Sequence, residues 1–147
     1  MKSRMNMNEA EPRIYQAMFF ADKQIKEFGI DAKLKELIKV RVSQINGCGY
    51  CIDSHSKDSL ALGESTQRLL ALSAWWETPF FSDSERAALK LAEEVTRVYE
   101  HGVSDETYEE ALKHFGKQGL AQIIFIAITI NSWNRIAIPV HMVAEVD

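Results

Sequence analysis

Apolar residues in this 147-residue chain recur at helical spacing along most of its length, and this periodicity limits the fold more than any other feature. The clearest case opens at Ser82 and Glu85, which have the spacing of a capping box at a helix start. Gly102 ends that helix. Its apolar side consists of Ala87, Ala88, Leu91, Ala92, Val95, Val98 and Tyr99. The same pattern predicts helices over residues 13–28, 32–45, 48–62, 65–76 and 104–115.

The segment 121–131 is rich in isoleucine and has the residue preferences of a strand. The sequence offers no second convincing strand to pair with it, and a lone strand is not stable. We therefore predict a buried helix that is apolar nearly all round. This makes the chain all-α, with one domain spanning residues 1–147 in which residues 1–11 form a loose N-terminal tail.

Charge and composition exclude some functions. The net charge of −4, with scattered Lys and Arg, argues against a nucleic-acid-binding protein, which is normally basic. The N-terminus has no apolar signal segment, and the apolar run 120–130 is shorter than the roughly 20 residues that span a bilayer. We therefore expect a cytoplasmic protein. In a reducing compartment a cysteine pair is more often catalytic, redox-sensing or metal-binding than structural.

The chemistry of the chain is concentrated in its two cysteines. Cys48, Cys51 and His55 follow one another at i, i+3 and i+7, which places them on one face of a helix near its start, with Asn46 as a possible cap. A helix N-terminus and a neighbouring base both lower a thiol pKa and favour the reactive thiolate. This stripe predicts thiol–disulfide chemistry. Half of a zinc site and inert buried packing are the alternatives, and we expect no metal and no cofactor.

Other polar residues are less decisive. Glu36 shares a face with Val40 and Ser43, which indicates either a solvated surface or, if the cysteine helix folds back, a carboxylate beside His55. Arg41 lies within an apolar face and must be paired if it is buried, most simply in a structural salt bridge. The segment 131–135, Asn-Ser-Trp-Asn-Arg, either lines a pocket or forms a hydrogen-bonded helix end.

Together these residues form a string that resembles a known family. Glu36, Arg41, Val42, Ser43, Asn46, Cys48, Tyr50, Cys51 and His55, at their spacing here, resemble the core motif of the AhpD-like alkylhydroperoxidases of the carboxymuconolactone decarboxylase superfamily. The resemblance implies an AhpD-like all-α fold, with the Cys-x-x-Cys pair at the start of a central helix. It also implies a homo-oligomer, as a dimer, trimer or hexamer. Well-characterised peroxidases of the group have a histidine where this chain has Tyr50.

The resemblance further implies a peroxidase. In it Cys51 attacks the peroxide, Cys48 resolves the product, and His55 and Glu36 relay protons. Tyr50, Ser43, Trp133 and Asn134 are candidates for contact with the substrate or for support around it. The expected partners are a peroxide and a dithiol reductant, such as a lipoyl-bearing protein, with no nucleic acid and no membrane. A decarboxylase-like enzyme without redox chemistry, and a redox-sensing or interaction protein, are the alternatives.

Overall fold

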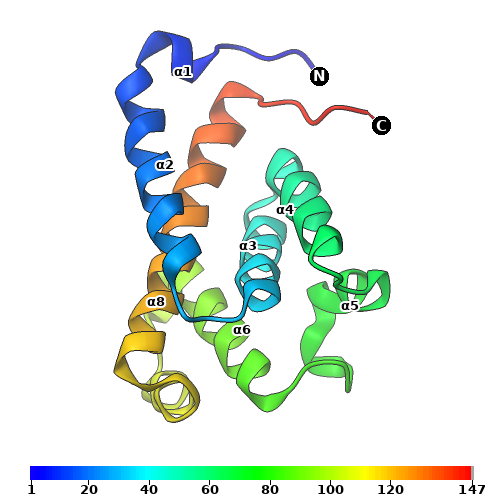
Figure 1. Ribbon diagram of the computed structural model, residues 1–147, viewed down its shortest axis with the longest axis vertical. Coiled ribbons are helices and arrows are strands. Elements are labelled where there is room, and N and C mark those ends of the chain that lie inside the picture. Colours follow the sequence, from blue (N-terminus) through cyan, green and yellow to red (C-terminus); the bar gives the residue numbers. More distant parts are fainter. Residues whose placement is uncertain (147) are drawn as a thin grey trace.

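The computed structural model describes residues 1–146, and within that range it contains helices and no strand (Figure 1). The all-α prediction is confirmed, including a helix over residues 121–131. The elements are α1 Met7–Ala10, α2 Pro12–Glu27, α3 Ala32–Asn46, α4 Gly49–Ala61, α5 Thr66–Ala71, the 3₁₀ helix η1 Leu72–Glu77, α6 Asp83–Thr96, α7 Val98–His101 and α8 Asp105–Val140.

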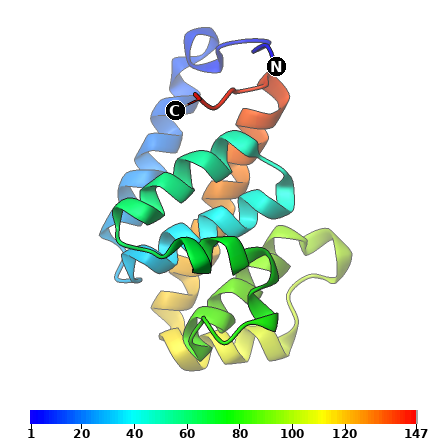
Figure 2. The same ribbon diagram turned by 90° about the vertical axis from the view of Figure 1, so that its right-hand side faces the viewer.

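Helix α3 is the centre of the fold and packs against α4, α6 and α8 (Figures 1 and 2). Its apolar residues Leu37, Ile38 and Val42 are fully buried, as are Ile123 and Ile126 of α8. Polar residues of α3 are buried as well, because the helix has neighbours on several sides. Buried polar groups must find partners inside the protein, and these partners form the site described below.

Tight turns decide how α4 returns along α3. Gly47 ends α3 in the left-handed conformation, with φ +71°, and its N–H donates to the carbonyl oxygen of Gln44. Cys48 follows in an extended conformation and is the N-cap of α4. The prediction that Asn46 caps this helix is therefore wrong. Asn46 is the last residue of α3, and its side chain is directed to α8 instead.

Some predicted boundaries also differ from the structure. The helix predicted over 65–76 is divided into α5 and η1, and η1 itself is kinked at Ala74, which has non-helical angles. The helix opened by the Ser82–Glu85 capping box, which is confirmed, breaks at Arg97 before α7. Part of the predicted loose tail is the short helix α1, and the N–H of Arg4 donates to the carbonyl oxygen of Val140.

Helix α8 joins two predicted segments into one. The chain passes through Gly116, which has a positive φ of 65°, and continues as helix to Val140. By length and composition alone, α8 is long and apolar enough to cross a membrane. Half of its most apolar stretch is buried inside the protein, however, which is typical of a core helix.

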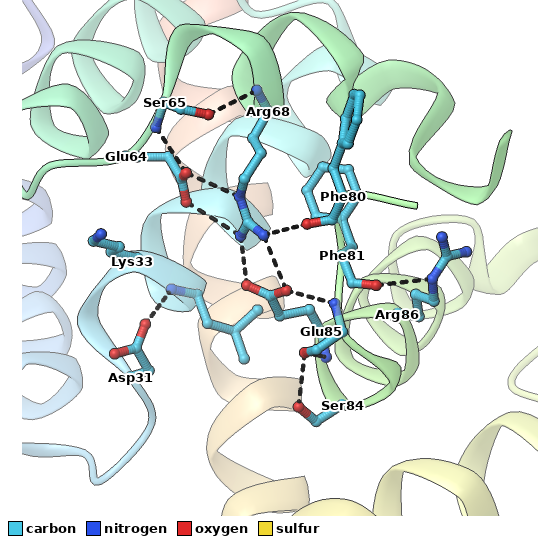
Figure 3. A network of polar contacts seen from close by, with 12 residues as sticks. Asp31, Lys33, Glu64, Ser65, Arg68, Phe80, Phe81, Ser84, Glu85 and Arg86 are labelled. Atoms are coloured by element: carbon cyan, nitrogen blue, oxygen red, sulfur yellow. Dashed lines mark hydrogen bonds and ion pairs between the residues drawn. The ribbon is translucent and has the colours of Figure 1, made fainter. Parts of the chain in front are cut away.

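A polar cluster fixes the far end of α4 to α6 (Figure 3). The guanidinium of Arg68 donates to Glu64 Oε1 at 2.9 Å, to Glu85 Oε1 at 2.5 Å and to the carbonyl oxygen of Phe80 at 2.5 Å. Glu85 is also the acidic member of the α6 capping box. The arginine thus joins the start of α5, the loop before α6 and the first turn of α6. This arrangement lies away from the cysteines and has a structural role.

Candidate active site

The two cysteines occupy the first turn of α4. Their sulfur atoms form a disulfide, with the Cα atoms 5.3 Å apart, and both residues are buried. The Sγ of Cys48 also accepts a hydrogen bond from the backbone N–H of Cys51, with an N···S distance of 3.3 Å. A sulfur at a helix N-cap is held where backbone N–H groups stabilise a thiolate. The structure thus describes an oxidised pair whose reduced form would favour an ionised Cys48.

His55 lies two turns into α4 and is held by α3. Its Nδ1 is 2.8 Å from Oε2 of Glu36, and the other oxygen of Glu36 accepts from Lys39 Nζ at 2.6 Å. Burial alone would raise the pKa of Glu36, but the His55 hydrogen bond and the Lys39 ammonium outweigh it and leave that pKa below its ordinary value. Glu36 is only 8% exposed, so the solvated-face interpretation is wrong. When Nδ1 of His55 carries the proton, it donates a hydrogen bond to the ionised Glu36. Nε2 is then the basic nitrogen of the ring.

A cavity of about 210 Å³ reaches Cys51 and His55. Tyr50 and Trp133, two of the candidates for substrate contact, line it. Aromatic rings from α2 and α8 form one side, since Tyr15, Phe19 and Trp133 contact one another with ring centroids 5.3 to 5.7 Å apart. The complete lining is Tyr15, Phe19, Asp22, Tyr50, Cys51, Ser54, His55, Trp133, Ala137 and Met142. The arrangement offers a space lined by four aromatic rings and several polar groups beside one sulfur and one imidazole.

Ser43 and Asn134 do not line this cavity. Both are fully buried, and Asn134 Nδ2 donates to Ser43 Oγ at 3.0 Å. Asn46 Nδ2 donates to Asn134 Oδ1 at 2.8 Å and to Asn131 Oδ1 at 2.9 Å. This network joins the end of α3 to α8 just before the cysteine turn. Within residues 131–135, Trp133 therefore faces the cavity, whereas Asn131 and Asn134 hold the helices together.

Arg41 is buried and paired, as its position in an apolar face required. Its Nε donates to Glu93 Oε1 at 2.6 Å, and Trp75 Nε1 donates to the same oxygen at 2.8 Å. The pair joins α3 to α6 and does not line the cavity at Cys51. Its place in the fold supports the structural interpretation of this arginine.

The sequence argument missed Asp22, which lies in α2 and lines the cavity with Cys51 and His55. Its Oδ2 accepts a hydrogen bond from Nε1 of Trp133 at 3.0 Å. A signal was available in the sequence, because Asp22 follows Met18 by four residues and precedes Ile25 by three, within the apolar stripe of α2. An acidic residue within an apolar stripe indicates a buried or functional carboxyl group, just as Arg41 within the apolar face of α3 indicates a buried, paired cation.

A second hollow, of about 480 Å³, lies on the Cys48 side of the pair. It is bounded by Gly47, Gly49, the end of α8 and the chain after it. Tyr50 borders both spaces, so it stands between the approach to Cys51 and the approach to Cys48. The two sulfurs are thus bordered by different spaces.

Glu36, His55 and Asp58 bring one possible ligand atom each to within 4.8 Å of one another. That spacing suits a metal ion, but Glu36 is already neutralised by Lys39 and hydrogen-bonded to His55. Asp58 is largely exposed, and its Oδ2 is 3.7 Å from His55 Nδ1. The contacts of Glu36 with Lys39 and His55 therefore already occupy both of its carboxylate oxygens.

Comparison with known proteins gives this site a family. Residues 10–94 match the model of the carboxymuconolactone decarboxylase family, and the chain belongs to that family. The uncharacterized protein YdfG of Bacillus subtilis is 40% identical over 138 residues, covering 94% of each chain. A shorter match is to the alkyl hydroperoxide reductase AhpD of Rhodopseudomonas palustris, 58% identical over 38 residues, which cover 26% of this chain and 21% of AhpD.

Solved structures confirm the AhpD-like fold. The protein of unknown function ATU0492 from Agrobacterium tumefaciens superposes with a TM-score of 0.96 at 34% identity, over 99% of this chain and all of that one. The debrominase Bmp8, solved in complex with 2,3,4-tribromopyrrole, has a TM-score of 0.84 at 22% identity, over 93% of this chain and 73% of its own. At that identity the debrominase shows a shared fold and no more.

Proposed function

We propose that this protein is a thiol-dependent peroxidase that reduces organic hydroperoxides through the Cys48–Cys51 pair. One observation carries the proposal. Cys51 and His55 border the same cavity, and Nδ1 of His55 is held by the buried carboxylate of Glu36. A thiol, a base and a carboxylate that orients the base are the components of an activated sulfur nucleophile.

The chemistry follows from these positions. His55 Nε2 takes the Cys51 proton, and the thiolate attacks the terminal peroxide oxygen. The O–O bond breaks, the alcohol leaves with a proton, and Cys51 becomes a sulfenic acid. Cys48, whose thiolate is favoured at the helix N-cap, then attacks the Cys51 sulfur. Water leaves, and the disulfide forms. Cys48 is thus the resolving thiol, even though it is nearer the helix start.

Turnover requires two electrons from a reductant. A dithiol would reduce the disulfide by thiol–disulfide exchange, and we propose a lipoyl-bearing or similar protein for this step. The hollow beside Cys48 gives a slender dithiol arm a separate approach. We also propose a homo-oligomer working in a reducing, cytoplasmic environment, because the family resemblance and the cycling thiols both favour it.

The test is consumption of cumene hydroperoxide with dihydrolipoamide as the reductant. We expect Cys51→Ser to abolish turnover, and Cys48→Ser to allow one oxidation of Cys51 that dimedone traps as a sulfenic acid. Equal turnover by the wild-type protein and Cys51→Ser would exclude the mechanism. A pair that oxidises stoichiometrically but is never reduced would indicate a redox sensor instead.

Histidine variants provide a matched control. His114 and Glu110 form a second His–Glu contact, at 2.9 Å, on the protein surface far from any cysteine in sequence. We expect His55→Asn to slow peroxide reduction by about 10²-fold, the usual contribution of a general base, and His114→Asn to leave it unchanged. Equal effects of the two substitutions would show that His55 has no special role.

A second candidate function is reductive dehalogenation of a small aromatic ring. The aromatic cavity beside Cys51 fits a planar ring, and the debrominase Bmp8 shares the fold. In that reaction a carbon–bromine bond is replaced by a carbon–hydrogen bond, and bromide is released. The two thiols supply the two electrons and form the same disulfide. Bromide release from a bromopyrrole, without peroxide turnover, would favour it. Turnover of a small lactone acid by the Cys48→Ser/Cys51→Ser double variant would instead favour a decarboxylase-like enzyme.

A further inference from the structure

Asp22 and His55 each line two neighbouring hollows in the protein surface. Both line the cavity that contains Cys51, and both line a larger, open groove of about 910 Å³ between α2, α3 and α4. Glu36, Lys39 and Asp58 line that groove as well. A titratable group that borders both a reaction cavity and an open groove can release a proton on one side and regain it on the other.

The carboxyl of Asp22 is held on one side. Its Oδ2 accepts from Trp133 Nε1, and within residues 1–146 this is the hydrogen bond that Asp22 makes. Trp133 is itself packed against Tyr15 and Phe19. In the part of the chain that the structure describes, the other oxygen of Asp22, Oδ1, accepts no side-chain hydrogen bond, and Asp22 lines the cavity. The indole fixes the orientation of the carboxyl while leaving this oxygen unused.

Charged groups from three helices act on Asp22. They are Lys26 on α2, Lys39 on α3 and His55 on α4, with Glu36 behind His55. Burial raises the pKa of Asp22, and the Trp133 hydrogen bond, Lys39, Lys26 and His55 in its protonated form act against that rise without reversing it. The pKa of Glu36 moves in the other direction. Of these two carboxyl groups, Asp22 is therefore the one that takes up a proton more readily.

Peroxide cleavage needs both a proton acceptor and a proton donor, because one proton leaves the thiol and one must reach the departing oxygen. We propose that Asp22 donates the proton to the leaving alkoxide, while His55 accepts the proton of Cys51. This rests on the proposed peroxidase function. The Cys51 sulfur gains the terminal hydroxyl, the O–O bond breaks, and the alcohol departs with the Asp22 proton. The imidazolium of His55, or water in the groove, then returns a proton to Asp22.

The test compares two peroxides of similar size that differ in leaving group. Cumene hydroperoxide releases an alkoxide, which needs a proton, whereas perbenzoic acid releases a carboxylate, which does not. Single-turnover oxidation of the reduced protein is measured with each. We expect Asp22→Asn, which keeps an oxygen acceptor for Trp133, to slow the cumene hydroperoxide reaction by about 10²-fold and to leave the perbenzoic acid rate nearly unchanged.

Controls separate this role from a structural one. Glu110→Gln removes an exposed carboxyl that pairs with His114 and borders neither space, and it should change neither rate, while Asp22→Glu should restore much of the cumene hydroperoxide rate. If Asp22→Asn does not fold, Asp22→Ser gives the same comparison. Equal slowing of both peroxides, or no slowing of either, would overturn the role of Asp22. If the wild-type protein forms no Cys48–Cys51 disulfide with either peroxide, the peroxidase function itself fails.

Discussion

Nδ1 of His55 lies 2.8 Å from Oε2 of Glu36, across a helical hairpin that brings together residues nineteen positions apart in the chain. Neither residue would hold its partner without the turn at Gly47 and Cys48, which returns α4 along α3. The same turn places the cysteines at the start of α4. One local feature of the backbone therefore assembles the base, its carboxylate and the thiols.

The Glu36–His55 contact makes stability depend on acidity. Because the pKa of Glu36 is lowered in the folded protein, its pairing contributes fully above its ordinary value of 4.5 and is lost as the pH falls through the folded value. We expect Glu36→Gln to lower the unfolding free energy at pH 7 by about 1.5 to 3 kcal/mol, as for a hydrogen bond to a charged group, and less as the pH falls below 4.5. Urea titrations across this range measure it.

Glu110→Gln is the matched control, because Glu110 also pairs with a histidine but is exposed. Little change is expected for that variant at any pH. A constant deficit for Glu36→Gln at all pH values would contradict the prediction.

The glycines on either side of Cys48 should respond in opposite directions. There is room for a Cβ atom at both positions, so the two glycines differ only in backbone conformation. Gly47 has φ +71°, where a side chain costs about 1 to 2 kcal/mol. Gly49 is the first residue of α4, where alanine favours the helix by up to about 1 kcal/mol. We expect thermal unfolding to show Gly47→Ala destabilised and Gly49→Ala unchanged or stabilised. The reverse order would show that the turn does not depend on the left-handed residue.

Removing only one partner of the Arg41–Glu93 salt bridge should lower the stability of the protein strongly. Both side chains are largely buried, and removing one partner leaves the other charge without compensation. We expect Arg41→Met to lower stability by about 3 to 5 kcal/mol, and Arg41→Met/Glu93→Leu to recover part of that loss. Chemical unfolding of both variants measures the coupling. Additive losses would show that the two residues do not act as a pair.

Asn134 should affect stability more than chemistry. It is fully buried and bonded to Ser43 and Asn46, but it does not line the cavity. We expect Asn134→Ala to cost at least about 2 kcal/mol, because it leaves buried partners unsatisfied. Peroxide reduction measured well below the unfolding transition should fall much less than for Trp133→Ala, which alters the cavity wall. Comparable losses of rate for the two variants would place Asn134 in the reaction itself.

Local signals in the sequence determined the helices, the Ser82–Glu85 capping box and the stripe of Cys48, Cys51 and His55, because each depends on residues a few positions apart. They also indicated that Arg41 needed a partner. Where the prediction failed, at Asn46, a long-range competitor decided the outcome. The Asn46 side chain donates hydrogen bonds to Asn131 and Asn134 on α8, and Cys48 is the N-cap of α4 instead.

Spacing along the chain did not show which acids lie beside the thiols, although the family resemblance indicated Glu36. Spacing left Glu36 on a possible solvated face, and only the packing of α4 against α3 buries it beside His55. Asp22 enters the cavity from α2 because Trp133, more than one hundred residues later, binds its carboxyl. Helical periodicity reports the faces of a helix but not which neighbour each face meets. The stripe of thiols and His55 could thus be found from the sequence, whereas the positions of Glu36 and Asp22 beside it depend on contacts between helices.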